Sequence, residues 1–387
     1  MDSKNVKTRF YIISDTHGEH LPAHLLPSAS AAVDVAIHCG DLTNGSKICE
    51  FRHTLDLLKK VDAPLKLVIA GNHDFTLDTP MFKKTIAEVH PPLEPELVAK
   101  EYGDWGEARR LMDDAKEAGI VFLEEGTYEF TLLNGAKLTV YASPYTPSMN
   151  DWGFQYPPGT QHDWLVENSD VVITHGPPHG ILDKAPGSPR LGCPSLFRAI
   201  DRARPKLHCF GHVHSGWGAK LVRWRDEPIE DVTHFTAIDN NHTTIIETLA
   251  GLTVGRFDDE SSAQGKQDRM ALLEKAGCIT TSHCEGDALP IVPLENTLFV
   301  NAAVQGPDES WQMPWLVDLE LPKALPDTRP VDLVQSKIPQ DTRLQVSYVA
   351  EDLAITQTHT ASGEVDRGGQ LKRKSEEEQG CQRRRKA

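Results

Sequence analysis

Short apolar runs recur along the first 215 residues, and five of them are followed within three residues by Asp, Asn or His. Several runs are continuous rather than alternating, which indicates strands buried on both faces of a sheet. The runs are 10–13, 33–38, 65–70, 138–141, 171–174 and 207–210. Helical spacing of apolar residues over 48–61 and 108–118 separates some of them, and Gly119 fits a helix C-cap. This alternation predicts an α/β layered domain.

The polar blocks after these runs supply seven side chains that can bind a metal ion. They are Asp15, His17, Asp41, Asn72, His175, His212 and His214. Each follows the end of a predicted strand, and ligands of open α/β sheets bind at that edge. Two divalent metals bridged by a carboxylate form a common device for cleaving phosphate esters. The order of the blocks therefore predicts a two-metal site, although each block alone also fits a turn or a structural histidine.

The donor set combines nitrogen and oxygen and contains no thiolate. It suits two divalent transition metals (Mn, Fe, Zn, Co or Ni) and disfavours a pure Ca or Mg site. The seven cysteines are scattered and form no C-x-x-C pair. That pattern argues against a disulfide framework or a zinc–thiolate site and favours a reducing compartment, so we expect a cytoplasmic location.

Charge and hydropathy limit the partners. The chain of 387 residues has a formal charge of -16 and no apolar run of membrane-spanning length, so we expect no membrane segment. The first apolar run is too short for a signal peptide. The acidic balance makes nucleic acid an unfavourable partner. A small anionic substrate is still compatible with this negative charge, because bound metals reverse the electric field of a carboxylate-rich site. The oligomeric state stays open.

Five motifs in this order resemble the calcineurin-like metallophosphoesterase family. They are Asp15-x-His17, Gly40-Asp41, Gly71-Asn72-His73-Asp74, Thr174-His175-Gly176 and Gly211-His212-x-His214. Further residues resemble the subfamily of metallophosphoesterase domain-containing proteins. They are Ser143-Pro144-Tyr145-Thr146-Pro147 with Trp152 and Phe154, His175-Gly176-Pro177-Pro178, Arg204-Pro205-Lys206-Leu207-His208 and Asn301-Ala302-Ala303. The resemblance covers about residues 8–222 and 295–321.

The resemblance implies a four-layer α/β/β/α sandwich, with two sheets packed together and helices outside. We expect this metallophosphoesterase domain over residues 8–321, with two late strands at 298–304 and 315–321. A poorly covered insertion would span about 223–294, and its polar stretch 258–268 is interpreted as a surface insertion. Residues 322–387 would form a polar C-terminal extension, with a weak element at 344–355 and a disordered end.

The resemblance also implies roles for the side chains. Asp15, His17 and His214 would hold the first metal, and Asn72, His175 and His212 the second. Asp41 would bridge the two ions, about 3.5–4 Å apart. His73 would stay off the metals and act as general acid or as a cation facing the phosphate oxygens. Asp74 would orient His73.

The reaction that these roles imply is phosphodiester hydrolysis by a metal-bridging hydroxide, with a small phosphodiester as substrate and cyclic nucleotides among the candidates. The alternatives are a phosphomonoesterase, a nuclease, or a non-catalytic scaffold of the same fold. A nuclease would need a basic groove, and the basic clusters at 372–374 and 383–386 lie only in the tail. These clusters resemble a bipartite nuclear signal, with a solvated charged tail as the alternative.

Four residues near the motifs are candidate substrate contacts: Tyr145, Trp152, His179 and Arg190. With Phe154 and Tyr156, the two aromatic residues would form a wall for a base; packing within the loop is the alternative. His179 and Arg190 would contact phosphate, or else lie exposed on a loop. Four residues inside apolar runs are interpreted as core: His38, Cys39, His208 and Cys209.

Overall fold

Two β-sheets form the centre of the computed structural model, which describes residues 4–226, 231–306, 310–325 and 336–337. The first sheet has six strands in the order β13-β15-β1-β2-β3-β4. Its strands are β1 (Asn5–Ile13), β2 (Val35–His38), β3 (Leu65–Val68), β4 (Ile120–Phe122), β13 (Ile279–Ser282) and β15 (Trp315–Pro322). Strands β1 to β4 run parallel, whereas β15 is antiparallel to β1.

The second sheet has eight strands in the order β12-β11-β14-β10-β9-β6-β5-β16. Its strands are β5 (Gly126–Thr131), β6 (Lys137–Ser143), β9 (Val171–Thr174), β10 (Leu207–Phe210), β11 (Gly218–Arg223), β12 (Thr244–Thr248), β14 (Asn296–Asn301) and β16 (Ser336–Lys337). Strands β6, β9, β10 and β14 are parallel neighbours. A small ladder joins β7 (Thr146–Pro147) to β8 (Gln155–Tyr156).

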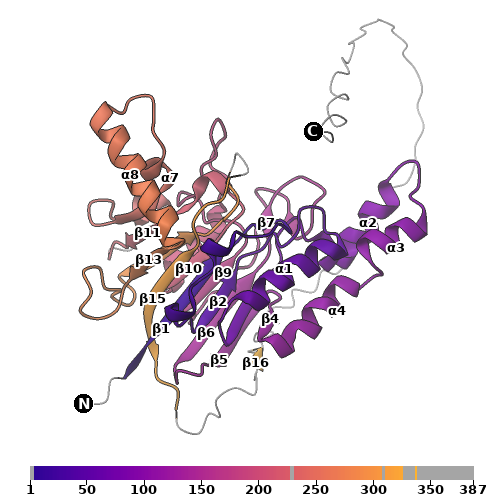
Figure 1. The fold of residues 1–387 in the computed structure, drawn as a ribbon, viewed down its shortest axis with the longest axis horizontal. Coiled ribbons are helices and arrows are strands. Elements are labelled where there is room, and N and C mark those ends of the chain that lie inside the picture. The colour runs from indigo at the N-terminus through magenta and orange to yellow at the C-terminus, as the bar shows by residue number, and fades with distance from the viewer. Residues whose placement is uncertain (1–3, 227–230, 307–309, 326–335, 338–387) are drawn as a thin grey trace, which may run out of the picture. The chain divides into compact units, whose positions relative to one another are not determined.

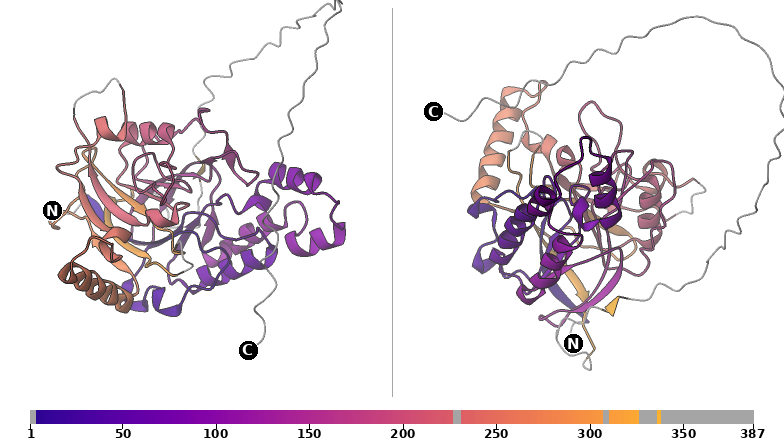
Figure 2. Two further views of the ribbon diagram at one scale, coloured as in Figure 1. Left: turned by 90° about the horizontal axis from the view of Figure 1, so that it is seen from above. Right: turned by 90° about the vertical axis from the view of Figure 1, so that its right-hand side faces the viewer.

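Most helices connect strands that follow one another in the sequence. The helices are α1 (Ile48–Lys60), α2 (Thr79–Glu88), α3 (Pro95–Tyr102), α4 (Glu107–Asp114), α5 (Pro194–Ala203), α6 (His234–Ala237), α7 (Leu249–Leu252) and α8 (Glu260–Ala276). Short 3-10 turns occur at Ala23–Leu25, Ala29–Ala31, Phe75–Leu77, Ala115–Ala118 and His214–Gly216. Helices α1 to α4 gather on one side of the molecule, and α8 lies on the opposite side (Figures 1 and 2). No helix in the described part of the chain is long and apolar enough to span a bilayer.

Successive side chains along the strands of the second sheet belong to two separate hydrophobic cores. Val171 and Ile173 of β9 belong to the large core that also takes in the first sheet and α1. Val172 between them belongs to a separate core that contains Leu196 and Phe197 of α5. Because successive side chains of a strand point to opposite faces, the layers run α1, first sheet, second sheet, α5. The predicted four-layer α/β/β/α sandwich is therefore confirmed.

The six apolar runs predicted as strands all contain strands of the two sheets, and both late strands are present. The four residues interpreted as core, His38, Cys39, His208 and Cys209, are fully buried. Continuous apolar sequence was a dependable indicator here, because the parallel strands are covered on both faces.

The stretch 223–294 contributes to both sheets. It supplies β12 at an edge of the second sheet and β13 at an edge of the first. The prediction that residues 258–268 lie at the surface is confirmed, since no side chain of α8 is buried. That stretch is nevertheless largely helical: Asp259 caps α8 by accepting a hydrogen bond from the Ser262 amide at 2.8 Å. The predictions for 344–355 and for the tail lie outside the described residues.

Candidate metal centre

All seven predicted metal-binding residues come after the carboxyl ends of parallel strands. Those of the first sheet follow β1, β2 and β3, and those of the second follow β9 and β10. The two sheets also meet at this edge: the Val304 amide, beyond β14, donates a hydrogen bond of 2.9 Å to the Ser14 carbonyl oxygen, beyond β1. The architecture thus brings the loops of both sheets to one place.

Three overlapping groups of side chains there have potential ligand atoms within 4.8 Å of one another. They are Asp15 with His17 and His214, Asp41 with His175 and His212, and His17 with Asp41 and His73. Asn72 joins the second group, because its Oδ1 lies 3.0 Å from His175 Nε2. The structure therefore brings all seven predicted ligands into one cluster, with His73 at its side.

The backbone of this cluster is strained. Asp15, His17, Asp41 and His212 have φ of 56°, 48°, 52° and 65°, in the left-handed region. A non-glycine residue held there costs on the order of 1–3 kcal/mol, and it persists only where the surroundings enforce it. Such outliers concentrate at functional sites, and here they direct four ligand side chains to the same point.

Glycine is required next to two of the carboxylates. A Cβ on Gly71 would collide with the amide and Oδ1 of Asp41, and a Cβ on Gly211 would collide with Oδ2 of Asp15. The close approach of these loops therefore needs residues without side chains, which explains the glycines in both motifs.

The spacing of the donors fits metal coordination. His17 Nε2 and His214 Nε2 are 3.3 Å apart, and His214 Nε2 lies 3.4 Å from Asp15 Oδ1. In the second group, His175 Nε2 lies 3.3 Å from Asp41 Oδ1. Donors about 2.1 Å from an ion are separated by about 3.0 Å in octahedral and about 3.4 Å in tetrahedral geometry. The residues present therefore fit two divalent ions.

The electrostatics favour ionised carboxylates, and they divide the four ligand histidines into two with a lowered pKa, His17 and His212, and two with a raised pKa, His175 and His214. Burial alone would raise the pKa of Asp15, but the hydrogen bond to His214 and the charges of His214 and His175 together outweigh burial and lower that pKa to about 2. Asp41 is buried too, and the charge of His175 holds its pKa well below the usual range. Burial lowers the pKa of His17, and it lowers that of His212 to about 4. Neutral imidazoles offer the lone pair that a metal needs, so His175 and His214 would release their protons when a metal binds.

His175 is oriented by a backbone contact. Its Nδ1 donates a hydrogen bond of 3.0 Å to the carbonyl oxygen of Cys39, which leaves Nε2 to face Asp41 and Asn72. Burial opposes its charge, but the carboxylate of Asp41 outweighs burial and raises the pKa of His175 to about 9. A backbone partner that fixes the ring of a ligand histidine is typical of metal sites.

His73 lies beside the cluster with one ring nitrogen fixed. Its Nδ1 donates to the Asn44 carbonyl oxygen at 2.6 Å, so Nε2 is left for a metal or a substrate. The ring packs edge-on against His17 at 4.8 Å between centroids, and it lies 4.2 Å from the ring of Trp152. Asn44 was not singled out from the sequence, because it contributes only a main-chain oxygen.

The expected contact between Asp74 and the His73 ring is wrong. The Asp74 carboxylate instead accepts hydrogen bonds from the amides of Gly71, Leu42 and Thr43 at 2.8, 3.0 and 2.9 Å. Burial, followed by the charge of Asp41, raises the pKa of Asp74 to about 7, and the backbone hydrogen bonds restrain that rise. Asp74 therefore ties the loop after β3 to the loop after β2.

Two buried histidines support the loops from behind, and sequence reasoning assigned them only to the core. His38 Nε2 lies 2.9 Å from Thr16 Oγ1, and His208 Nε2 lies 2.9 Å from Thr174 Oγ1. Each threonine is adjacent in sequence to a predicted ligand. The two sheets thus use the same device, a strand histidine holding the threonine of the ligand loop.

The expected aromatic wall is divided. Trp152 packs with His73 and with Phe75, whose ring is 6.2 Å away. Tyr145 instead packs with Phe154 at 5.9 Å and with His162 at 4.9 Å. Among the described residues, no ring contact joins Trp152 to Tyr145. Trp152 is thus the aromatic candidate that touches the metal cluster.

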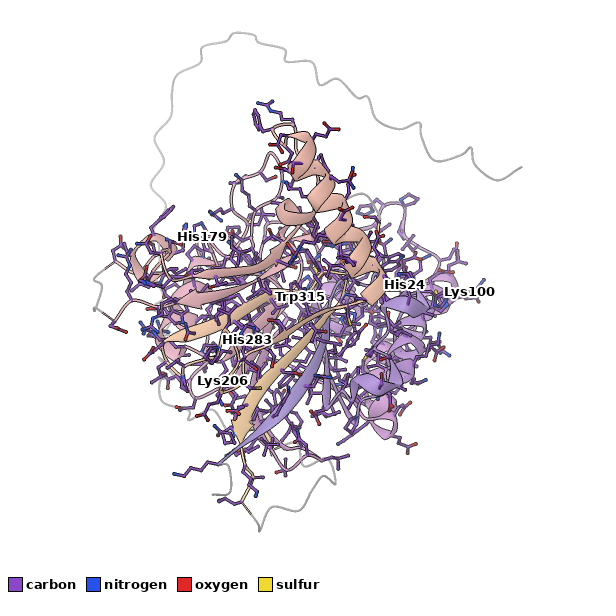
Figure 3. The ribbon with its side chains drawn as sticks, turned by 60° about the vertical axis from the view of Figure 1, so that its left-hand side comes forward. His24, Lys100, His179, Lys206, His283 and Trp315 are labelled. Atoms are coloured by element: carbon purple, nitrogen blue, oxygen red, sulfur yellow. The ribbon has the colours of Figure 1, made fainter. Side chains whose placement is uncertain are left out.

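His179 and Arg190 lie outside the metal cluster. Arg190 Nη1 pairs with the buried Asp183 at 2.6 Å, and the His179 ring packs 5.1 Å from that of His234. Figure 3 places His179 on the opposite side of the molecule from Lys100 of α3. Both residues line a cavity at the start of α5, which is described below.

Comparison with known proteins agrees with this geometry. The sequence model of the calcineurin-like phosphoesterase family matches residues 8–216, which is more than half of the chain. The chain belongs to that family. Among curated proteins, it is 32% identical over 219 residues to metallophosphoesterase domain-containing protein 1 of Homo sapiens, covering 54% of this chain and 62% of that protein.

A UPF0046 protein of Caenorhabditis elegans is 33% identical over 221 residues, covering 54% of this chain and 52% of that protein. The chain thus spans about half to three fifths of the length of these relatives. Among solved structures, the TT1561 protein of Thermus thermophilus matches with a TM-score of 0.36 and 12% identity, covering 56% of this chain and 84% of that one.

Proposed function

We propose that this chain is a dinuclear metal-dependent phosphodiesterase. The observation that supports this most directly is the position of Asp41. Its Oδ1 lies 3.3 Å from His175 Nε2, and its Oδ2 lies 3.9 Å from His17 Nε2. The two oxygens therefore face different groups of histidines, as a carboxylate that bridges two ions requires.

The ligand sets follow the two groups. Asp15, His17 and His214 would hold one ion, and Asn72, His175 and His212 the other. When bound, the two ions would polarise the phosphate oxygens and supply a nucleophilic water of lowered pKa. The mixed nitrogen and oxygen donors suit Mn, Fe, Zn, Co or Ni, and manganese is the first metal to test.

His73 completes the proposed machinery from the side of the cluster. With Nδ1 held by the Asn44 carbonyl oxygen, its Nε2 can donate a proton to the departing alcohol or a hydrogen bond to a phosphate oxygen. Proton transfer by a positioned side chain contributes roughly 100- to 10,000-fold to a rate. Trp152, packed on the His73 ring, would both fix that ring and offer a surface to the substrate.

A diester is proposed over a monoester for two reasons. The chain resembles metallophosphoesterase domain-containing proteins, and an aromatic side chain lies against the general acid, where the organic part of a diester would lie. A small phosphodiester such as a cyclic nucleotide is the proposed substrate class. The proposed catalytic unit is the domain over residues 8–321.

The first experiment is hydrolysis of bis-p-nitrophenyl phosphate by metal-stripped protein refilled with Mn. We expect metal-dependent turnover that falls at least 100-fold in Asp41→Asn, because the variant removes the charge shared by both ions. Asp56→Asn, on the exposed face of α1, is the matched control and keeps wild-type turnover. p-Nitrophenyl phosphate is assayed beside the diester.

The outcomes separate the alternatives. Unchanged turnover in Asp41→Asn would overturn the dinuclear assignment. Faster cleavage of p-nitrophenyl phosphate than of the diester would make the chain a phosphomonoesterase. No turnover by protein that binds Mn or the other transition metals would make it a non-catalytic scaffold of the same fold.

A further inference from the structure

A cavity of about 600 Å³ lies at the first turn of α5, apart from the metal cluster. It is formed by the loop 147–161, the loop 179–193 and the start of the helix. Its polar lining includes Tyr156, His179, Arg190, Ser195 and Arg198. None of the side chains assigned to the metals belongs to this lining, so the cavity is distinct from the metal cluster.

The charge of this lining is positive. Two arginines and a histidine line the cavity together with neutral residues, and the lining contains no Asp or Glu. This is unexpected in a chain with a net charge of -16. Arg198 is exposed and forms no ion pair with any described residue. Its guanidinium is therefore available to a ligand.

The charge of Arg190 acts on neighbouring groups beside the cavity. Arg190 pairs with Asp183, which is the buried carboxylate of this region. Burial lowers the pKa of Lys220 and of His234, and the charge of Arg190 adds to both effects. The charge of Arg190 is therefore felt beyond its ion pair with Asp183.

The N-terminal end of α5 adds to the positive potential of the cavity. Pro194 and Ser195, in the first turn of the ten-residue α5, line the cavity. The helix dipole is positive at that end, although Pro194 has no N–H group and the Leu196 amide already donates to Cys193 Sγ at 3.3 Å. Arg198, one turn further along, lies on the same face as Ser195. The Arg198 guanidinium and the N-terminal end of α5 therefore lie on the same side of the cavity.

The cavity adjoins the metal centre through two connections. His179 follows the ligand His175 by four residues, so their Cα atoms are at most about 14 Å apart. The loop also rests on the turn that carries His214: Ser215 Oγ donates to the Lys184 carbonyl oxygen at 3.2 Å. The loop that lines the cavity therefore begins no more than about 14 Å from a predicted metal ligand.

We propose that this cavity binds a second anionic group of the substrate, a phosphate or carboxylate on the part that is not cleaved. The preferred substrate would then be a phosphodiester that carries a further negative charge. This inference rests on the proposed function, which it extends from the reacting phosphate to the group that selects the substrate. Arg198 and His179 would be the specificity-determining residues, and Arg190 would be fixed for the same task by Asp183.

Two chromogenic esters that differ only by one phosphate test the proposal in the full, metal-refilled chain. One is the 5′-p-nitrophenyl ester of thymidine 5′-monophosphate, and the other carries an additional phosphate on the 3′-hydroxyl. Both release p-nitrophenol, so the ratio of their kcat/KM values isolates the second anion. Hydrogen bonds between charged partners change affinity by about tenfold or more.

We expect the wild-type chain to prefer the 3′-phosphorylated ester. Arg198→Ala should lower the kcat/KM ratio about tenfold, mainly through KM, and Arg198→Lys should restore part of the loss. The matched control is Arg202→Ala, an exposed arginine one turn further along α5 that does not line the cavity; it leaves the ratio unchanged. A ratio that Arg198→Ala does not alter, or that Arg202→Ala lowers equally, overturns the proposal.

A calorimetric titration separates failure of this proposal from failure of the proposed function. Metal-stripped protein is titrated with thymidine 3′,5′-bisphosphate, thymidine 5′-monophosphate and inorganic phosphate. If neither ester is hydrolysed, the phosphodiesterase assignment fails, and tighter binding of the bisphosphate that Arg198→Ala abolishes still supports the cavity. Equal binding of the two nucleotides overturns it. Inorganic phosphate that binds as tightly as the bisphosphate would mark a site for a free ion and overturn the substrate role.

Discussion

His208 illustrates at the residue scale how the interior supports the ligand loops. It is fully buried, and its Nε2 lies 2.9 Å from the hydroxyl of Thr174, next to the ligand His175. Burial lowers the pKa of His208 to about 3. The ring is therefore neutral in the folded chain over the whole neutral and mildly acidic range.

This burial predicts a dependence of stability on pH. Between pH 6.5 and 3 the unfolded chain binds a proton at His208 and the folded chain does not, so stability falls as pH falls. The loss approaches about 1.4 kcal/mol per pH unit below about pH 6.5, and it is absent above that pH. We expect the stability advantage of wild type over His208→Gln to shrink by about 1.4 kcal/mol between about pH 7.5 and 5.5, measured by urea unfolding.

The exposed His242 offers a control for this prediction, because its ring stays in water and pairs only with Asp239. His242→Gln is therefore measured beside His208→Gln as the substitution of an exposed histidine. A difference between wild type and His208→Gln that stays constant over the same pH range would show that His208 binds a proton as readily in the folded as in the unfolded chain, and would contradict the burial argument.

At the scale of elements, Asp74 ties together the loops after β2 and β3. It receives hydrogen bonds from the amides of Leu42, Thr43 and Gly71. These loops also deliver Asp41 and Asn72 to the metal centre. The arrangement makes Asp74 a positioning residue, whose effect on chemistry passes through the ligands.

Asp74→Asn should loosen both loops. The amide side chain keeps one acceptor oxygen and turns a donor toward buried N–H groups, so we expect a loss of roughly 3 kcal/mol in stability. Metal affinity should fall about 10- to 100-fold, as for other residues that hold ligands in place. Thermal unfolding and calorimetric metal titration measure the two effects.

Turnover at saturating metal decides the role of Asp74. A positioning role predicts recovery to within about tenfold of the wild-type rate once both metals are bound. Wild-type metal affinity combined with lost turnover would instead make Asp74 a direct participant in the reaction. Asp56→Asn, exposed on α1, controls for the change of charge.

The same scale shows what sequence could and could not predict. The parallel strands were predictable, because burial on both faces demands continuous apolar runs such as 171–174. Helix α8 was not, since none of its side chains is buried and no apolar period marks it. The Asp74 contacts were misjudged because adjacency to His73 suggests a pair, while the partners come from residues 42 and 43 of another loop. The cavity beside α5 combines two separate segments, 147–161 and 179–198, and no local pattern reveals such a meeting.

On the scale of the whole molecule, the metal cluster joins the two sheets. Asp15, His17, Asp41 and Asn72 come from the first sheet, and His175, His212 and His214 from the second. Each proposed ion would therefore take ligands from both sheets. The stretch 223–294, which the family resemblance does not cover, adds an edge strand to each sheet and so belongs to the same framework.

An ion bound across both sheets should stabilise the whole domain. At a free concentration of about 100 times Kd, one ion adds about 2.7 kcal/mol, which for a domain of this size is a rise of about 4 °C in Tm. We expect Mn to produce at least this rise in metal-stripped protein by scanning calorimetry, and Asp41→Asn to lose most of it. His73→Ala should retain the rise while losing turnover, because His73 is proposed to stay off the ions. If His73→Ala loses the rise as Asp41→Asn does, His73 is a ligand together with His17 and Asp41, a grouping that their geometry also permits.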